Sequence, residues 1–175
     1  METKSCAIIG HRPTRFKFKY NENDSRCKRL KKRLREQFVE LYHQGIHRFL
    51  VGGALGVDQW SGEILLKLKL EPEYKDIELV VVLPYQGHDE RWDDRSRSRL
   101  AFLIKHSAEC IIVGKRAWRD SFIQKDRYLV DHADCLLVVH NDDRKDPEPI
   151  ISYALQKNVL VICVHPDSGI ISKKE

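Results

Sequence analysis

The chain has 175 residues, of which 42% are hydrophobic, and a formal net charge of +5. This length fits one domain with a substantial core and leaves little room for a second, so residues 1–175 are expected to form a single domain. No apolar run approaches the roughly 20 residues that span a bilayer, and the first residues lead into a strand-like run instead of an apolar leader. A soluble, cytoplasmic protein with no membrane partner is therefore expected.

Five cysteines are present, and none has the spacing of a metal or redox motif. Cys6, Cys110, Cys135 and Cys163 lie in strand-like apolar runs, while Cys27 lies near a helix start with no second cysteine or histidine at ligand spacing. The sequence predicts buried, reduced thiols and no metal site.

Six short apolar runs alternate with longer amphipathic segments. The runs are rich in Val, Ile and Leu with little alternation, which indicates strands covered on both faces. Strands are predicted at 5–9, 48–51, 77–83, 109–113, 135–140 and 159–164, and helices at 25–44, 57–70, 93–106, 122–132 and 149–157. This order predicts an α/β fold, a Rossmann-like doubly wound sheet of six mainly parallel strands with helices on both faces. Such sheets bind ligands at the carboxyl ends of their strands.

The loop after the first predicted strand combines a glycine with an arginine. Gly10 permits close backbone approach, and the planar guanidinium of Arg12 suits bidentate contacts with phosphate or carboxylate. The alternative is that Arg12 only pairs with a structural carboxylate such as Asp58. A single histidine after a strand is more often packed than catalytic, which makes His11 a weaker candidate. The predicted ligand-binding residues of this loop are Gly10, His11, Arg12, Pro13 and Thr14.

The first predicted helix concentrates cations. The segment Lys28–Arg35 holds six Lys and Arg residues within eight positions. Such a run is usually the solvated face of a helix, and the alternative is a surface that binds nucleic acid or another polyanion.

A glycine-rich turn, 52–58, joins the second predicted strand to the helix that follows. Such a turn exposes backbone N–H groups at the positive end of a helix dipole, where proteins hold phosphates. Asp58 is either a structural residue of the first helical turn or an acceptor for ribose hydroxyls. Glu63 shares a helix face with Gln59, and either reaches the pocket or is a solvated carboxylate. The predicted ligand-binding residues here are Gly52, Gly53, Ala54, Gly56, Asp58 and Gln59.

The later loops offer aromatic and paired groups. After the third strand, Tyr85 and Trp92 can stack a base and Gln86 can read its edge, although Trp92 is equally suited to anchor the next helix. Before the fifth strand, Arg127 and Asp131 lie four residues apart and either contact a ligand or pair with each other. The loop 141–149 contains no glycine, which predicts a poor second phosphate cradle.

Taken together, these motifs resemble the YpsA-like family of the SLOG superfamily, a Rossmann-like group that also contains the DNA-processing protein DprA and the cytokinin-activating LOG enzymes. The residues that carry the resemblance are 10–13, 52–60 with Glu63, 84–86 with Trp92, and 130–131. It implies a nucleotide-derived ligand, such as NAD or ADP-ribose, across the two N-terminal loops. The chain departs from many relatives at Lys125-Asp126, where they carry Arg-Asn, and at 145–147, where they carry Gly-Gly-Thr.

Three functions stay open on the sequence. The first is binding or sensing of a small nucleotide-like ligand. The second is hydrolysis of an N-glycosidic bond, as in nucleotide phosphoribohydrolases, with Glu63 or Asp58 as the catalytic carboxylate; the chain lacks the Pro-Gly-Gly-x-Gly-Thr-x-x-Glu segment of LOG enzymes. The third is DprA-like binding of single-stranded DNA through Lys28–Arg35. The oligomeric state also stays open on the sequence, and a homodimer is one alternative because Rossmann-like relatives often form dimers.

Overall fold

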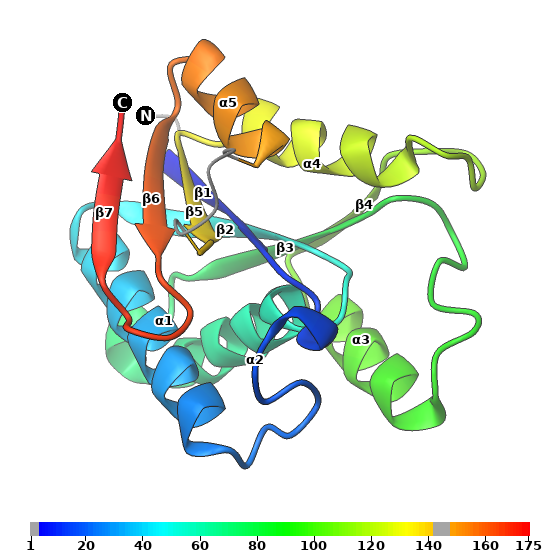
Figure 1. Cartoon of the computed structure of the whole chain (residues 1–175), viewed down its shortest axis with the longest axis horizontal. Coiled ribbons are helices and arrows are strands. Elements are labelled where there is room, and N and C mark those ends of the chain that lie inside the picture. The colour runs from blue at the N-terminus through cyan, green and yellow to red at the C-terminus, as the bar shows by residue number, and fades with distance from the viewer. Residues whose placement is uncertain (1–3, 142–147) are drawn as a thin grey trace.

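The computed structural model describes residues 4–141 and 148–175 and shows a mixed sheet between two layers of helices (Figure 1). The strand order is β4-β3-β2-β1-β5-β6-β7. Strands β1 to β6 are parallel, and β7 pairs antiparallel with β6. The strands are β1 (Lys4–Gly10), β2 (Ile46–Gly52), β3 (Glu78–Leu83), β4 (Glu109–Ile112), β5 (Cys135–Val139), β6 (Leu160–Val164) and β7 (Ile171–Lys174).

The α/β Rossmann-like prediction is confirmed, but the expected number of six strands is wrong. The seventh strand, β7, follows a turn in which Gly169 adopts φ +72° and places Ile171 opposite Val164. It has only four residues and ends in two lysines, so it carries no apolar run of the kind that marked the other strands. The bounds of the other strands differ from the predicted ones by no more than two residues.

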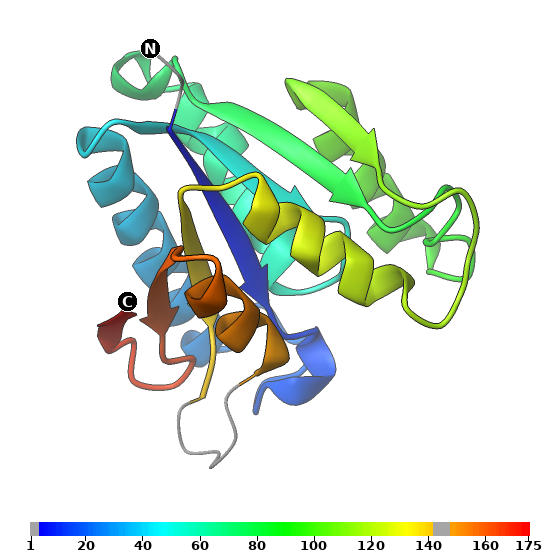
Figure 2. The ribbon, with the colours of Figure 1, turned by 90° about the horizontal axis from the view of Figure 1, so that it is seen from above.

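Helices cover both faces of the sheet, as the apolar runs predicted (Figures 1 and 2). Phe49 and Val51 of β2 belong to the core on one face, and Leu50 between them belongs to the core on the other, because successive strand side chains point to opposite sides. The first face carries α1 (Ser25–His43), α2 (Val57–Lys69) and α3 (Asp94–His106), and the second carries α4 (Ser121–Asp131) and α5 (Pro149–Gln156).

The strand order reverses between β1 and β5. From β1 the chain adds β2, β3 and β4 on one side, and α4 then crosses back over β3, β2 and β1 before the chain enters β5 (Figure 2). The carboxyl ends of β1 and β5 therefore border the crevice where doubly wound sheets bind their ligands.

Local chemistry defines the helix ends. Asp24 and Asp93 cap α1 and α3 by accepting hydrogen bonds from the backbone N–H groups of Arg26 and Ser96. Helix α2 begins differently, because its N-cap, Gly56, provides no side-chain cap. The backbone N–H of Val57 donates to the carbonyl of His11 at 3.5 Å, and the other N–H groups of this first turn are left to further partners.

Four cysteines, Cys6, Cys27, Cys135 and Cys163, are buried free thiols, as predicted. The expectation for Cys110 is wrong: it is exposed, because β4 is the edge strand of the sheet. Among the described residues, no helix combines the length and apolarity that crossing a membrane requires.

Candidate functional site

The loops after β1 and β2 are packed directly against each other. A Cβ built on Gly10 would lie 2.5 Å from the Cβ of Val57, and one on Gly56 would lie 2.6 Å from the carbonyl oxygen of His11. Gly56 also adopts φ +90°, which L side chains rarely tolerate. The two glycines therefore lock the start of α2 beside the segment that carries Arg12.

Gly52 and Gly53 stand at positions where a side chain would collide with its neighbours. Neither has a positive φ. A Cβ on Gly52 would lie 2.6 Å from Oδ2 of Asp58 and 2.9 Å from Nζ of Lys125, while one on Gly53 would lie 2.4 Å from Cδ2 of Leu83. These glycines thus make room for neighbouring side chains, and they admit Lys125 of α4 to the turn.

Asp58 lies inside the turn and faces a buried lysine. Its side chain accepts a hydrogen bond from the N–H of Ala54 at 3.2 Å, and its residue is only 4% exposed. Lys125 Nζ, in a residue that is 5% exposed, lies 3.9 Å from Oδ2 of Asp58 and 3.4 Å from Oδ1 of Asp126. Burial raises the pKa of Asp58 to about 6, and the Lys125 ammonium opposes that rise. Burial likewise raises the pKa of Asp126.

In the sequence, Lys125 stood out only as part of a pair, Lys125-Asp126, at which this chain departs from many relatives. A better signal was available, since Ser121, Lys125 and Leu129 are spaced at one face of a helix and all three are buried. A lysine on the apolar face of a helix that covers a sheet needs a buried partner, and here Asp58 and Asp126 supply it.

Arg12 presents its guanidinium at the surface of the same region. Its Cζ lies 5.0 Å from the centre of the Phe122 ring, and Lys125 Nζ lies 5.7 Å from that centre. Within the part of the chain that the structure describes, no hydrogen bond or ion pair engages Arg12. The alternative that Arg12 pairs with Asp58 is not what the structure shows. An exposed arginine whose guanidinium lies over an aromatic ring is well suited to an external anion.

A second group of side chains lies where β1 and β5 end. His11 Nε2 and His140 Nδ1 lie 3.9 Å and 4.0 Å from Oε1 of Glu148. Nη1 of Arg15 lies 3.5 Å from the same oxygen and 3.4 Å from Nδ1 of His11. Glu148 also lines a cavity of about 310 Å³ between α4 and α5, together with Ile123, Asp126, Arg127, Pro149, Ile150 and Tyr153.

The loop after β3 borders the glycine turn through His88, which is not among the predicted ligand-binding residues. His88 Nε2 donates a hydrogen bond to the carbonyl of Gly53 at 2.7 Å, and burial lowers the pKa of this imidazole. Trp92 is half-buried and meets His88 edge to face, with the ring centres 5.2 Å apart. Tyr85 approaches the edge of Phe122, and Gln86 is exposed.

Other predicted residues lie around the outer side of α2. Gln59 is buried and donates to the carbonyl of Ser96 at 3.2 Å. Gln59 lines a cavity of about 270 Å³ together with Pro13 and Gly56. Thr14 is exposed in the 3₁₀ turn Pro13–Arg15.

Two predicted residues lie apart from this group. The carboxylate of Glu63 is held by Arg99 at 2.6 Å, and Arg99 also binds Glu22 at 2.6 Å, which forms an ion-pair cluster between α2, α3 and the segment before α1. Asp131 closes α4 and accepts a hydrogen bond from the Tyr153 hydroxyl at 2.8 Å.

The pair Arg127 and Asp131 does not form. Arg127 lies over the Tyr153 ring at 5.2 Å, so both residues contact Tyr153. The glycine-free segment 142–147, including Lys145-Asp146-Pro147, lies outside the described residues.

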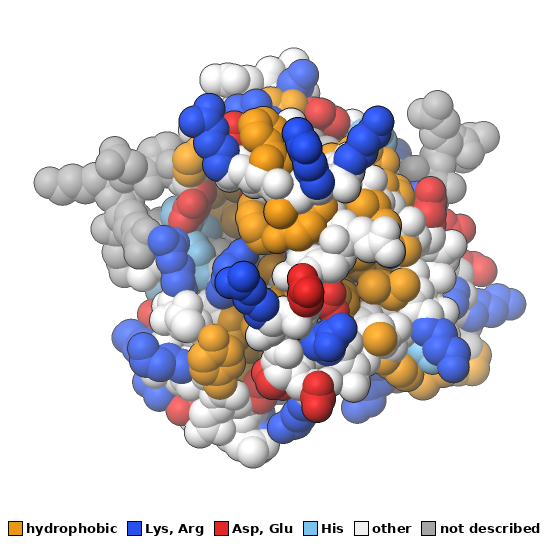
Figure 3. All heavy atoms as spheres, turned by 90° about the vertical axis from the view of Figure 1, so that its right-hand side faces the viewer, with side chains coloured by type: hydrophobic (Ala, Val, Ile, Leu, Met, Phe, Trp, Pro, Cys, Tyr) orange, Lys and Arg blue, Asp and Glu red, His pale blue; other side chains and the backbone are white. Residues whose placement is uncertain are grey.

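Figure 3 views the molecule from the side at which β1, β2 and β3 end. Hydrophobic side chains gather there among Lys and Arg, with only a few acidic groups at the centre of the view. Exposed hydrophobic residues of the α4 region include Trp118, Phe122 and Ile123. Fold and site together define a Rossmann-like α/β protein. Cations and aromatic rings gather near the carboxyl ends of its strands, where the strand order reverses between β1 and β5.

Comparison with known proteins identifies the family. The YpsA model, described as the YspA SLOG family, matches residues 6–160, and the chain therefore belongs to this family. UPF0398 proteins of Staphylococcus aureus strains JH9, USA300 and NCTC 8325 are each 25% identical to it over 118 residues, which are 66% of this chain and 62% of theirs. The chain thus matches less than two thirds of the length of these relatives.

A solved structure shares the fold. It is that of DNA processing protein A from Helicobacter pylori, described for its single-stranded DNA binding mode. The TM-score is 0.57 at 16% identity, over 92% of this chain and 65% of that chain. At this level of identity the likeness concerns the fold alone.

Proposed function

We propose that this protein binds a nucleotide-derived ligand through its phosphate groups, in the region between Arg12, the start of α2 and the start of α4. The observation that carries the proposal is the state of Arg12. Its guanidinium is exposed, rests on Phe122 and has no acidic partner among the described residues. A planar cation that already lies over an aromatic ring loses less side-chain entropy on binding a phosphate than a freely rotating one does.

The surroundings favour an anion over a cation at this place. The first turn of α2 has no side-chain cap, and its positive dipole end lies beside the loop that carries Arg12. Asp58 points inward to Ala54 and Lys125, so its charge is compensated within the turn. The groups that attract an anion here are therefore Arg12 and the positive end of α2.

The remainder of a nucleotide would find apolar and polar groups nearby. Phe122 and Tyr85 offer ring faces and edges, and the cavity of about 310 Å³ beside α4 combines Tyr153 with the carboxylates of Asp126 and Glu148. This volume is at the lower end of the range for small-molecule sites and suits one nucleoside unit. The ligand class that we propose is NAD, in which a diphosphate joins two nucleosides, or ADP-ribose, in which it joins one nucleoside to a ribose.

We favour binding over N-glycosidic hydrolysis because the two candidate carboxylates are engaged within the protein. Glu63 is held by Arg99, and Asp58 is enclosed by Ala54 and Lys125. A carboxylate that attacks or stabilises a ribosyl cation must reach the ligand.

Isothermal titration of ADP-ribose, NAD and AMP into the wild type and Arg12→Ala tests the proposal. A charge-assisted hydrogen bond contributes about 1.5–3 kcal/mol, so Arg12→Ala should weaken binding by roughly 10- to 150-fold. Arg97→Ala removes an exposed arginine of α3 and serves as the matched control. No binding of any of the three compounds to the wild type, or equal affinity in Arg12→Ala, contradicts the proposal.

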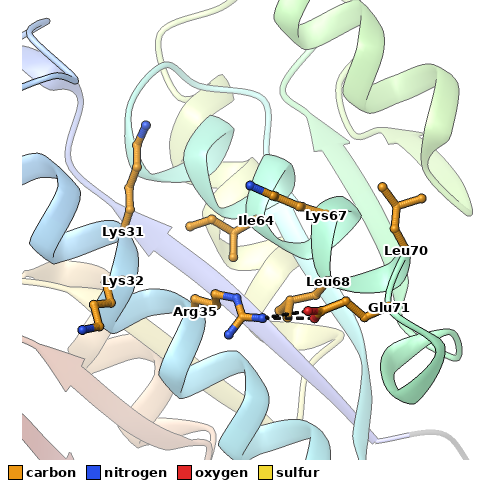
Figure 4. A pocket seen from close by; sticks show the side chains of 8 residues that line it. All are labelled: Lys31, Lys32, Arg35, Ile64, Lys67, Leu68, Leu70 and Glu71. Carbon is orange, nitrogen blue, oxygen red and sulfur yellow. Dashed lines mark hydrogen bonds and ion pairs between the residues drawn. The ribbon is translucent and has the colours of Figure 1, made fainter.

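Binding of single-stranded DNA is a second candidate, which a separate surface favours. A groove of about 510 Å³ between α1 and α2 is lined by Lys31, Lys32, Arg35, Ile64, Lys67, Leu68, Leu70 and Glu71 (Figure 4). Arg35 binds Glu71 and Lys31 binds Glu22, whereas Lys32 and Lys67 have no acidic partner within the described residues. The fold is shared with a protein described for single-stranded DNA binding.

Fluorescence anisotropy with a labelled oligothymidylate at low and high salt tests this second candidate. Lys32→Glu/Lys67→Glu should abolish an interaction that weakens steeply with salt. The double variant Lys105→Glu/Lys173→Glu changes the net charge equally at exposed positions elsewhere and should bind as the wild type does. Loss of binding in both double variants would indicate only a net-charge effect.

A further inference from the structure

Two imidazoles and a carboxylate lie close together where the strand order reverses, at the carboxyl ends of β1 and β5. His11 follows β1, His140 follows β5, and Glu148 precedes α5. One donor atom from each residue lies within 4.8 Å of the other two. This group is distinct from Arg12 and Phe122, and the proposed phosphate contacts do not use it.

The three side chains form a donor set that is typical of transition metals. Imidazole nitrogen suits zinc, iron, copper and nickel, whereas calcium and magnesium prefer sites built from oxygen alone. Two histidines with one carboxylate occur in catalytic zinc sites and in non-haem iron sites, where three protein ligands leave positions open for water or a ligand.

The distances are compatible with a bound ion after small movements. Zinc bonds of about 2.0–2.2 Å in a tetrahedron place neighbouring donors roughly 3.3–3.6 Å apart. The present separations from Glu148 Oε1 are 3.9 Å to His11 Nε2 and 4.0 Å to His140 Nδ1. His140 is 3% exposed and is fixed by the core, while His11 and Glu148 are half-buried and have room to adjust.

The guanidinium of Arg15 supplies the positive charge that faces Glu148 and His11 in this cluster. Its Nη1 lies close to both Glu148 Oε1 and His11 Nδ1. Because arginine only donates, His11 accepts through Nδ1 here and carries its proton on Nε2. Coordination through Nε2 requires the proton on Nδ1, which then faces the guanidinium. The Arg15 side chain is 48% exposed and can swing into solvent, so Arg15 and a metal ion exclude each other.

We propose that His11, His140 and Glu148 bind one divalent transition-metal ion, with Zn²⁺ as the preferred occupant, and that Arg15 leaves the cluster when the ion binds. The cysteine spacing predicted no metal site, and these ligands carry no motif spacing because the fold brings them together from distant parts of the sequence. Since Glu148 also lines the cavity of about 310 Å³, the ion lies at the wall of that cavity. The metal site does not depend on nucleotide binding.

Zinc titration of the full chain against a chromophoric chelator tests this proposal. All proteins carry Cys110→Ser, which removes the exposed thiol that is itself a zinc ligand. One ion should bind per chain. His11→Ala and Glu148→Gln should each weaken binding by more than about 100-fold, because losing even an outer-shell partner costs roughly 10- to 100-fold. Thermal melts and circular dichroism verify that each variant folds.

Three further measurements make the test specific. His106→Ala removes an exposed histidine of α3 and should leave the affinity unchanged. Arg15→Ala should tighten zinc binding a few-fold, the size expected for one half-exposed charge. Co²⁺ should give visible d–d bands in the parent protein and lose them in His11→Ala.

Zinc binding by the parent that is no tighter than by His11→Ala/Glu148→Gln overturns the metal site. Unchanged affinity in Arg15→Ala overturns the exclusion between Arg15 and the ion.

Discussion

Asp58→Asn tests the buried charge network at the heart of the glycine turn. The pKa of Asp58 is raised from an ordinary value of 3.8 to about 6, chiefly by burial. At about 1.4 kcal/mol for each pH unit, this difference amounts to roughly 3 kcal/mol against the ionised carboxylate at pH 7. Because the folded state holds the proton more tightly than the unfolded chain, the contribution of Asp58 to stability falls as pH rises from about 4 to about 6.

Asparagine keeps a side-chain oxygen that accepts the hydrogen bond from Ala54 and does not titrate in this range. We expect the free energy of unfolding of the wild type, relative to Asp58→Asn, to decrease by up to about 3 kcal/mol between pH 4 and pH 7. Urea unfolding followed by circular dichroism at several pH values measures this difference. Asp94→Asn, an exposed substitution of the same chemistry, controls for the loss of one negative charge. Parallel profiles for the wild type and Asp58→Asn would refute the reasoning.

Two further predictions concern stability elsewhere. Gly56→Ala should destabilise the fold by about 2 kcal/mol or more, because φ is +90° and the new Cβ would press on the His11 carbonyl. Gly87→Ala, with φ +84° and nothing within 4 Å, should cost only about 1 kcal/mol, and equal losses in thermal melts would contradict the packing explanation. The pKa of Glu22 is lowered to about 2, and hydrogen bonds from Arg99 and Lys31 outweigh the opposing effect of burial. Glu22→Gln should therefore lower the urea midpoint at pH 7, and the difference from the wild type should shrink as pH falls from about 4.5 towards 2; a constant difference would argue against an ionic contribution.

The sequence was sufficient for most of the sheet and its helices. Strands such as β3, with five consecutive buried residues after Glu78, have to be apolar on both faces, so their composition alone reveals them. Strand β7 was not predicted from the sequence, because an edge strand of four residues that is half exposed and rich in lysine does not have to be apolar.

The site was predicted less completely than the fold, because part of it comes from segments that only the topology brings together. Arg12 and the glycine turn stand in short contiguous motifs directly after strands, and the structure brings them together. Lys125 and the pair His140 and Glu148 meet them only because α4 crosses the sheet and β5 lies beside β1. The purpose of Gly52 was also hidden in the sequence, since it depends on side chains that approach from α2 and α4.

The most direct test of the central claim is a crystal structure of the full chain with ADP-ribose. We expect the diphosphate within hydrogen-bond distance of the Arg12 guanidinium and the first-turn N–H groups of α2, with one nucleoside unit beside Phe122 or in the cavity next to Tyr153. ADP-ribose bound elsewhere, for example in the groove between α1 and α2, or a soaked crystal with the Arg12 region free of ligand, would contradict the account.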